Sequence, residues 1–222
     1  MAPGSRAVIF DVDGVLVDSY HAHLESWVLM AREHGLHITE EEFATTFGQT
    51  SREIIARFWG AGLPPAEREA LDARKEAIYR DVIRAHFPAM DGAVELIDAL
   101  AAAGFLLAVG SSGPPENIEL SLERLGRSAS FQARVTGRDV TRGKPDPQVF
   151  AVAADRLGIP ATRCAVIEDA PVGIAAAHAA GMASIALVGT APAEAFAAAD
   201  LVVTSLRQLT PPAVASLVDR QR

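Results

Sequence analysis

Residues 7–14 read AVIFDVDG, an apolar run that ends abruptly in two acids and a glycine. Four consecutive apolar side chains followed by acids are typical of a strand that is buried on both faces of a parallel sheet. Similar apolar runs recur later in the chain, at 106–109, 131–135, 164–167, 184–188 and, as a candidate for a sixth strand, 201–203.

Helical patterns lie between these runs. Residues 115–125 begin with proline, which suits the first turn of a helix, and stop at Gly126. Comparable helices are predicted at 93–103, at 146–158 with Asp146 as the cap, and at 171–181. Alternating strands and helices predict an α/β fold, a doubly wound parallel sheet with helices on both faces.

The segment 17–87 breaks this alternation. It contains no convincing strand, and most of it reads as helices, several of them amphipathic: 20–33, 40–47, 52–59 and 65–84. We therefore predict two domains. Residues 1–16 and 88–222 form the α/β core, and residues 17–87 form a helical cap that is inserted after the first strand.

Composition narrows the function. Of the 222 residues, half are hydrophobic and 22% are charged, which excludes wholesale disorder, and the net charge of −8 disfavours non-specific nucleic-acid binding. The lone cysteine, Cys164, cannot form an intrachain disulfide and favours a cytoplasmic setting. Residues 1–6 carry no signal segment, and prolines and glycines interrupt the apolar stretch 170–193, so no membrane partner is predicted. A monomer or weak homodimer is expected.

Acids, hydroxyls and a lysine follow the predicted strands. Ligands bind at the carboxyl ends of the strands in an open parallel sheet. The side chains expected there are Asp11, Asp13, Ser111, Ser112, Lys144, Glu168 and Asp169. Crowded acids repel one another unless a cation lies among them, and hard oxygen ligands favour Mg²⁺. A hydroxyl and an ammonium beside such a metal suit a phosphate group.

These parts are sufficient for phosphoryl transfer. A carboxylate held against Mg²⁺ can attack phosphorus in line and form an aspartyl-phosphate. A second carboxyl group two residues further on shares the same side of a strand end, so it can protonate the leaving oxygen and later deprotonate a water. The residue between them, Val12, is then expected to point into the core.

Residues 11–19, DVDGVLVDS, resemble the first motif of the haloacid dehalogenase-like superfamily. Ser111, Lys144 and the pair Glu168 and Asp169 fall in the order of its second, third and fourth motifs. The resemblance spans nearly the whole chain and includes the helical insert. Taken together, the motifs are specific, whereas each alone would be weak.

The resemblance implies a role for each of these side chains. Asp11 would be the nucleophile and Asp13 the general acid and base, while Ser111, with Ser112 beside it, and Lys144 would hold the phosphate. Mg²⁺ would be held by Asp11, the backbone carbonyl of Asp13, and Asp169, with Glu168 ligating the metal directly or through a neighbour.

The branch that this chain resembles most contains β-phosphoglucomutase-like and sugar-phosphate phosphatase proteins. His23 matches a histidine that helps to close the cap, Arg52 matches an arginine that grips the distal end of the substrate, and Lys75 falls near another cap residue that faces the site. Read as residues alone, His23 and Arg52 fit cap packing equally well, and Lys75 better fits a solvated helix position.

Three functions remain. The first is a Mg²⁺-dependent phosphatase for small phosphate monoesters of a sugar or polyol. The second is a β-phosphoglucomutase-type mutase, which would use the same core residues. That mutase has a lysine where this chain has Gly48, which favours the phosphatase. The third is a non-catalytic phosphate-binding module, which would leave the insert and Asp13 unexplained. Dehalogenase activity is not expected, because those enzymes lack the second aspartate.

Overall fold

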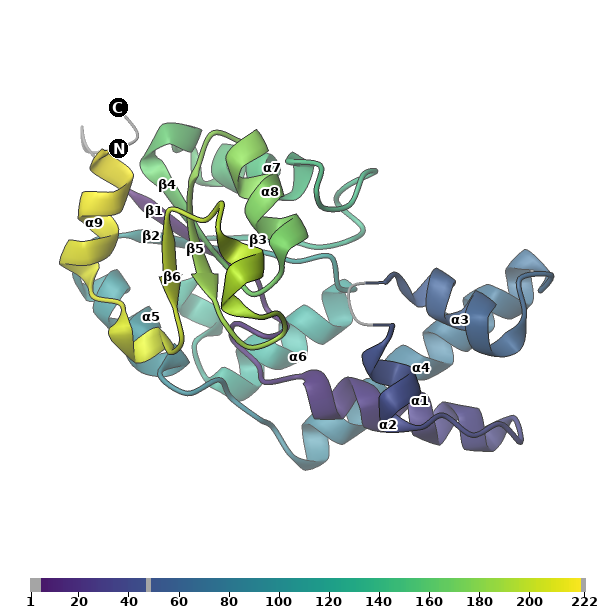
Figure 1. Ribbon diagram of the computed structural model, residues 1–222. Coiled ribbons are helices and arrows are strands. Elements are labelled where there is room, and N and C mark those ends of the chain that lie inside the picture. The colour runs from purple at the N-terminus through teal and green to yellow at the C-terminus, as the bar shows by residue number, and fades with distance from the viewer. Residues whose placement is uncertain (1–4, 47–48, 221–222) are drawn as a thin grey trace. The chain divides into compact units, whose positions relative to one another are not determined.

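The computed structural model describes residues 5–46 and 49–220. The chain divides into two compact units. One, the core unit, comprises Met1–Asp18 and Ala89–Arg222; the other, the helical unit, comprises Ser19–Pro88. Figure 1 labels their elements. None of the described helices has both the length and the apolar character needed to cross a bilayer.

Among the described residues, the core unit contains one sheet of six strands, all parallel, in the order β3-β2-β1-β4-β5-β6 (Figure 1). The strands are β1 (Ala7–Phe10), β2 (Leu106–Gly110), β3 (Ala133–Val135), β4 (Cys164–Glu168), β5 (Ala183–Leu187) and β6 (Leu201–Val203). The α/β fold with a parallel sheet is therefore confirmed. The chain builds outward from β1 in one direction and then from β4 in the other, so the topological switch point lies between β1 and β4.

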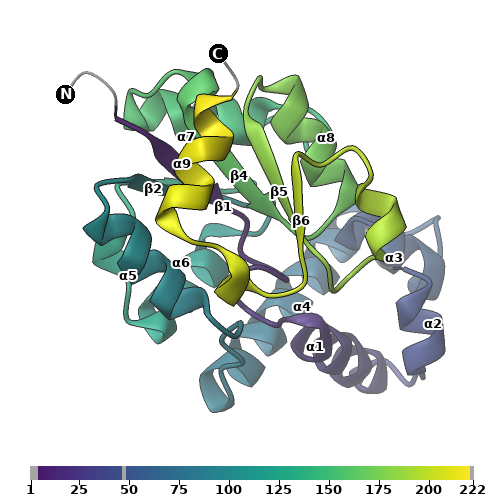
Figure 2. The same cartoon turned by 60° about the vertical axis from the view of Figure 1, so that its left-hand side comes forward.

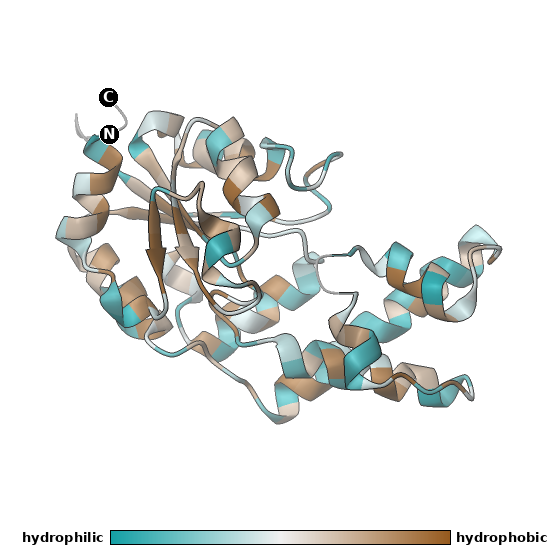
Figure 3. Ribbon diagram, in the orientation of Figure 1, coloured by the Kyte–Doolittle hydropathy of each residue, from teal (hydrophilic) through white to brown (hydrophobic). Residues whose placement is uncertain are grey.

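Helices cover both faces of this sheet. They are α5 (Ala93–Ala102), α6 (Pro115–Leu125), α7 (Gln148–Leu157), α8 (Pro171–Ala179) and α9 (Pro211–Asp219). Helices α7 and α8 pack on one face, and α5 and α9 lie on the other (Figure 2). Both faces of the central strands are therefore buried, which explains why these strands are continuously apolar (Figure 3).

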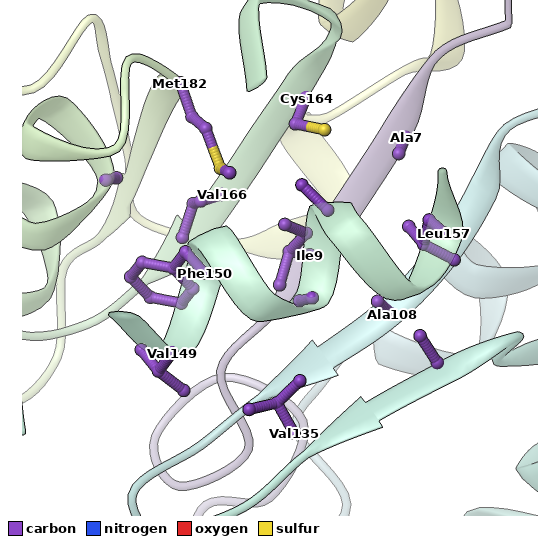
Figure 4. Close-up of a cluster of buried hydrophobic side chains, with 14 of the residues drawn as sticks. Ala7, Ile9, Ala108, Val135, Val149, Phe150, Leu157, Cys164, Val166 and Met182 are labelled. Atoms are coloured by element: carbon purple, nitrogen blue, oxygen red, sulfur yellow. The ribbon is translucent and has the colours of Figure 1, made fainter. Parts of the chain in front are cut away.

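The core beneath α7 is closely packed. Phe150 and Leu157 of α7 lie in one cluster with Ile9 of β1 and Val166 of β4 (Figure 4). A Cβ atom on Gly110, the last residue of β2, would lie only 2.9 Å from Cδ1 of Phe150. Glycine at this position therefore lets the ring of Phe150 approach the end of the strand.

The starts of α7 and β3 differ from the sequence prediction. Helix α7 begins at Gln148, one residue later than predicted, and the Asp146 carboxylate accepts the N–H of Gln148 at 3.0 Å. Strand β3 is two residues shorter at its start than predicted. Residue Val12 is buried, as the alternation at the strand end predicted.

The helical unit contains α1 (Tyr20–Glu33), α2 (Glu40–Ala44), α3 (Ser51–Trp59) and α4 (Pro65–Ala85). It has a hydrophobic core of its own, to which Trp27, Phe43 and Ile78 belong. Helix α2 was predicted to reach residue 47 but ends at Ala44. Phe47 and Gly48 lie outside the described residues.

Candidate active site

The ends of β1 and β4 meet at the switch point. The backbone N–H of Asp11, the residue after β1, donates to the carbonyl of Ile167 in β4 at 3.0 Å. Glu168 is the last residue of β4, and Asp169 follows it. Because adjacent parallel strands end at the same sheet edge, this pairing brings the first and fourth sequence motifs together.

The ammonium of Lys144 contacts both Asp11 and Glu168. Its Nζ lies 2.6 Å from Oδ1 of Asp11 and 2.5 Å from Oε1 of Glu168, and its side chain is 9% exposed. Lys144 belongs to the loop between β3 and α7, more than 130 residues from Asp11 in sequence. Its Nζ lies 4.9 Å from the ring centroid of Phe150, which adds a cation–π contact.

Glycines make room for the two acids at the end of β4. A Cβ atom on Gly14, whose φ is +74°, would lie 2.0 Å from Oδ2 of Asp169. A Cβ atom on Gly173 in α8 would lie 2.0 Å from Oε1 of Glu168. The Asp169 carboxylate therefore lies directly against the loop that carries Asp13. Glu168 Oε2 also accepts the N–H of Ala170 at 2.8 Å, which ties it to the start of α8.

Asp13 and Ser111 approach each other at the end of β2. A Cβ atom on Gly113 would lie 3.4 Å from Oγ of Ser111 and 3.9 Å from Oδ2 of Asp13, so both groups face that glycine. The N–H of Gly113 donates to Oγ of Ser111 at 3.1 Å. Ser111 is buried, whereas Ser112 is exposed.

The site has more buried negative charge than positive charge. Asp11, Glu168 and Asp169 are all buried, and Lys144 is the cation that contacts Asp11 and Glu168. Burial raises the pKa of Asp11 to about 7, with Lys144 opposing the shift and Glu168 adding to it. Burial, reinforced by Glu168 and Asp11, also raises the pKa of Asp169.

Burial and the acidic neighbours of Lys144 act on its pKa in opposite directions. Burial alone would lower its pKa, but the carboxylates of Asp11 and Glu168 outweigh burial and hold that pKa above the usual range. The ammonium is therefore charged at all physiological pH values. It neutralises only part of the surrounding acid.

The donor set fits a divalent cation. Additional positive charge would oppose the burial and the repulsion that raise the pKa values of Asp11 and Asp169, and carboxylate and carbonyl oxygens are the ligands that Mg²⁺ prefers. Within residues 5–46 and 49–220, no group of three or more His, Cys, Asp or Glu side chains is arranged as a ready metal site. The ligand set that the family resemblance implies includes a backbone carbonyl, that of Asp13, as well as side chains.

The three predicted cap residues lie in the helical unit. Lys75 is only 3% exposed, so the solvated position that its sequence context favoured is wrong. Its Nζ lies 2.9 Å from Nδ1 of His23 and 2.8 Å from Oε1 of Glu76, and it also lies over the ring of Trp27. Lys75 is buried because these partners, brought from α1 and α4, compensate its charge. Arg52 is exposed on α3.

One neighbour of the site escaped the sequence analysis. The hydroxyl of Thr190, in the loop after β5, donates to the backbone carbonyl of Asp169. The same hydroxyl acts to lower the pKa of Asp169, against the effect of burial. Its position carries the signal, because Thr190 follows the predicted strand 184–188 just as the other site residues follow strands.

The fold and the site together define an α/β enzyme whose acids and lysine gather at the switch point of a parallel sheet. A model of the haloacid dehalogenase-like hydrolases matches residues 5–181, and the chain belongs to this family. The family predicted from the sequence is thereby confirmed. Together with the phosphatases among its relatives, it also confirms the predicted enzyme class, a phosphoric monoester hydrolase.

Two curated relatives match over nearly the full chain. Validoxylamine A 7'-phosphate phosphatase of Streptomyces hygroscopicus subsp. limoneus is 32% identical over 208 residues, covering 92% of this chain and 95% of that protein. Hexitol phosphatase A of Escherichia coli is 33% identical over 205 residues, covering 92% and 93%. Among solved structures, CbbY from Rhodobacter sphaeroides in complex with phosphate has a TM-score of 0.87 at 26% identity, covering 96% of this chain and 100% of that one.

Proposed function

We propose that this protein hydrolyses phosphate monoesters of sugars or polyols through an aspartyl-phosphate on Asp11. The observation that carries the proposal is the Asp11 carboxylate at the switch point, 2.6 Å from the Lys144 ammonium, with Glu168 at the end of the adjoining strand and Asp169 directly after it. Small phosphate esters are the substrates that the family implies. A site that holds a buried carboxylate against a fixed cation suits attack on phosphorus, since the cation can bind the phosphoryl oxygens as they approach.

Each side chain has a distinct task in this proposal. Asp11 attacks phosphorus, and Lys144 and Ser111 hold the phosphoryl oxygens. Asp13 protonates the leaving oxygen and then takes a proton from the water that releases phosphate. Asp11, Asp169 and the carbonyl of Asp13 would hold Mg²⁺, which supplies charge neutralisation between the acids and the phosphoryl group. Glu168 holds Lys144 in place through the 2.5 Å contact.

The relatives support a polyhydroxylated leaving group. Their names refer to the phosphates of validoxylamine A and of hexitols, and both proteins align with this chain over more than nine-tenths of their length. We propose that His23, Arg52 and Lys75 recognise the hydroxyl-rich part of such a substrate. Arg52 is the most direct candidate, because its side chain is exposed.

The experiment is the substitution Asp11→Asn, assayed for phosphate release from hexitol phosphates and p-nitrophenyl phosphate. Loss of the nucleophile should lower kcat by more than about 10³-fold. The variant should remain folded, because a carboxyl group whose pKa is raised to about 7 by burial destabilises the folded state when it is ionised. Appreciable turnover by a folded Asp11→Asn protein would refute the assignment.

The same preparations distinguish hydrolysis from mutase activity. A coupled assay for glucose 6-phosphate formed from β-glucose 1-phosphate should give no signal while free phosphate accumulates. Glucose 6-phosphate without free phosphate would instead show that a sugar hydroxyl, not water, takes the phosphoryl group from Asp11.

A further inference from the structure

Lysine is scarce in this chain, and both lysine side chains are largely shielded from solvent. Among the 20 basic residues, only Lys75 and Lys144 are lysines, and the rest are arginines. Lys144 lies in a loop of twelve residues, 136–147, that has no helix or strand of its own. Such a loop would leave the ammonium free to move unless other contacts fix its backbone. Several of the contacts that fix it come from Gln148, the first residue of α7.

Gln148 collects the backbone of this loop at one atom. Its Oε1 accepts the N–H of Thr141 at 2.9 Å, the N–H of Arg142 at 3.0 Å and the hydroxyl of Thr141 at 3.2 Å. Backbone N–H groups can only donate, so these contacts also establish which end of the amide faces the loop. Two loop N–H groups that are otherwise not paired by a helix or strand are satisfied by this oxygen.

A second brace lies on the other side of Lys144. The Asp146 carboxylate accepts the N–H of Gln148 at 3.0 Å and the guanidinium of Arg142 at 2.5 Å. The loop thus closes on itself at Thr141 and Arg142 before the lysine, and at Asp146 and Gln148 after it. Lys144 projects from between these anchors toward Asp11 and Glu168.

The neutral amide suits this position. An acceptor oxygen is needed for the N–H groups, yet Asp11, Glu168 and Asp169 already crowd the site with buried acid. Gln148 supplies the oxygen without adding a charge that would compete for the Lys144 ammonium. Gln148 belongs to none of the sequence motifs described above, and none of their residues accepts the N–H groups of Thr141 and Arg142.

We propose that Gln148 is a positioning residue that holds the 136–147 loop so that Lys144 stays between Asp11 and Glu168. Its effect on catalysis rests on the proposed function, because that function has Lys144 bind the phosphoryl group. Its effect on the position of Lys144 does not, and can be measured on the protein without substrate.

The test compares the wild type with Gln148→Met, which keeps the length but removes the acceptor, and Gln148→Glu, which keeps the acceptor. Each folded protein is treated briefly with N-hydroxysuccinimidyl acetate, and acetylation of Lys144 and Lys75 is measured by peptide mass spectrometry. Lys75, 3% exposed in the helical unit, is the internal reference. The kcat/KM for p-nitrophenyl phosphate is measured on the same samples.

In Gln148→Met, acetylation of Lys144 should rise several-fold while Lys75 stays protected, and kcat/KM should fall by about 10- to 100-fold. Gln148→Glu keeps the acceptor, so Lys144 should stay better protected than in Gln148→Met, while the added charge competes for the ammonium and keeps kcat/KM below the wild-type value. Unchanged protection of Lys144 in Gln148→Met would overturn the proposal, as would an equal rise at Lys75 or equal loss of protection in Gln148→Met and Gln148→Glu. A wild type without phosphatase activity but with the predicted labelling pattern would refute the proposed function alone.

Discussion

Lys144 determines the electrostatic balance of the site, because it is the cation between two buried acids. Removing one partner of a buried ion pair leaves the other charge without compensation. We predict that Lys144→Met lowers the free energy of unfolding by about 3–5 kcal/mol in metal-free buffer at neutral pH. Urea denaturation measures this loss, and an unchanged midpoint and slope would show that the ammonium does not compensate Asp11 and Glu168.

Asp139 anchors the start of the 136–147 loop, which carries Lys144. Its Oδ1 lies 2.5 Å from the Arg156 guanidinium, and its Oδ2 accepts the N–H and the hydroxyl of Thr136. The contact with Arg156, with those from Thr136, lowers the pKa of Asp139 to about 2. When the pKa of an acid is lower in the folded state than in the unfolded state, its ionised form stabilises the folded protein at pH values above the unfolded-state pKa. This stability is lost as the pH falls through the folded-state pKa.

We therefore predict that Asp139→Asn is less stable than the wild type at neutral pH, and that the difference shrinks as pH falls from about 4 towards 2. Denaturant titrations at several pH values test this, with Asp146→Asn as a comparison in the same loop. A difference that stays constant down to the lowest pH at which both proteins fold would contradict the role assigned to Arg156.

At the scale of single residues, the sequence predicted which side chains gather at the strand ends, but not the burial of Lys75 in the helical unit. Asp11, Lys144 and Glu168 could be grouped in advance, because each follows or precedes a recognisable strand end. The burial of Lys75 could not be predicted, because His23, 52 residues away, and Trp27 reach it only when α1 packs on α4. The roles of the site residues remain predictions that the substitutions above test.

Among the elements, the turn after β1 leaves no room for a side chain at Gly14. Gly14 has a positive φ of +74°, and a Cβ there would lie 2.0 Å from Oδ2 of Asp169. We predict that Gly14→Ala displaces the Asp169 carboxylate and lowers both kcat and the affinity for Mg²⁺, measured by calorimetry without substrate. The backbone strain of alanine in this conformation, about 1–2 kcal/mol, is a separate cost.

Gly126 provides a matched control, since its φ is +67° and a Cβ there would meet no atom within 4 Å. Gly126→Ala should show the strain cost in stability but keep kcat and Mg²⁺ affinity. If both variants lose Mg²⁺ affinity equally, the effect comes from strain and not from contact with Asp169.

The strands and most helices were predicted at nearly their observed positions because apolar runs and helix-stop glycines mark them. The errors arose where side chains set the boundary. At α7, which begins at Gln148, Asp146 accepts the first N–H of the helix. The hydroxyls of Thr45 and Thr46 donate to the carbonyls of Glu42 and Phe43 at the end of α2. No periodicity encodes such local competition for backbone groups.

For the whole molecule, the alternation of strands and helices predicted a parallel sheet, and its order came from the structure. Placing β1 between β2 and β4 is what joins Asp11 to Glu168 and Asp169. Periodicity cannot supply this neighbour relation, because it describes one segment at a time. In the sequence, the motifs are linked by the general rule that ligands lie at strand ends and by their resemblance to the motifs of one superfamily.

The excess of buried acid predicts that Mg²⁺ stabilises the folded protein. A cation that binds only the folded state at 100 times its dissociation constant adds about 2.7 kcal/mol. The thermal midpoint should therefore rise with Mg²⁺ and fall in EDTA, and activity should vanish in EDTA and return on adding Mg²⁺. The shift should be reduced in Asp169→Asn. Full turnover in EDTA would contradict the proposed metal site.

The central claim is that the phosphoryl group passes through Asp11. Turnover is stopped with acid and the protein is treated with borohydride, which reduces an acyl phosphate to an alcohol and converts the aspartate to homoserine. We predict homoserine at position 11 only when substrate is present. Steady release of phosphate with Asp11 unmodified, or with the trapped group on Asp13 instead, would contradict the account.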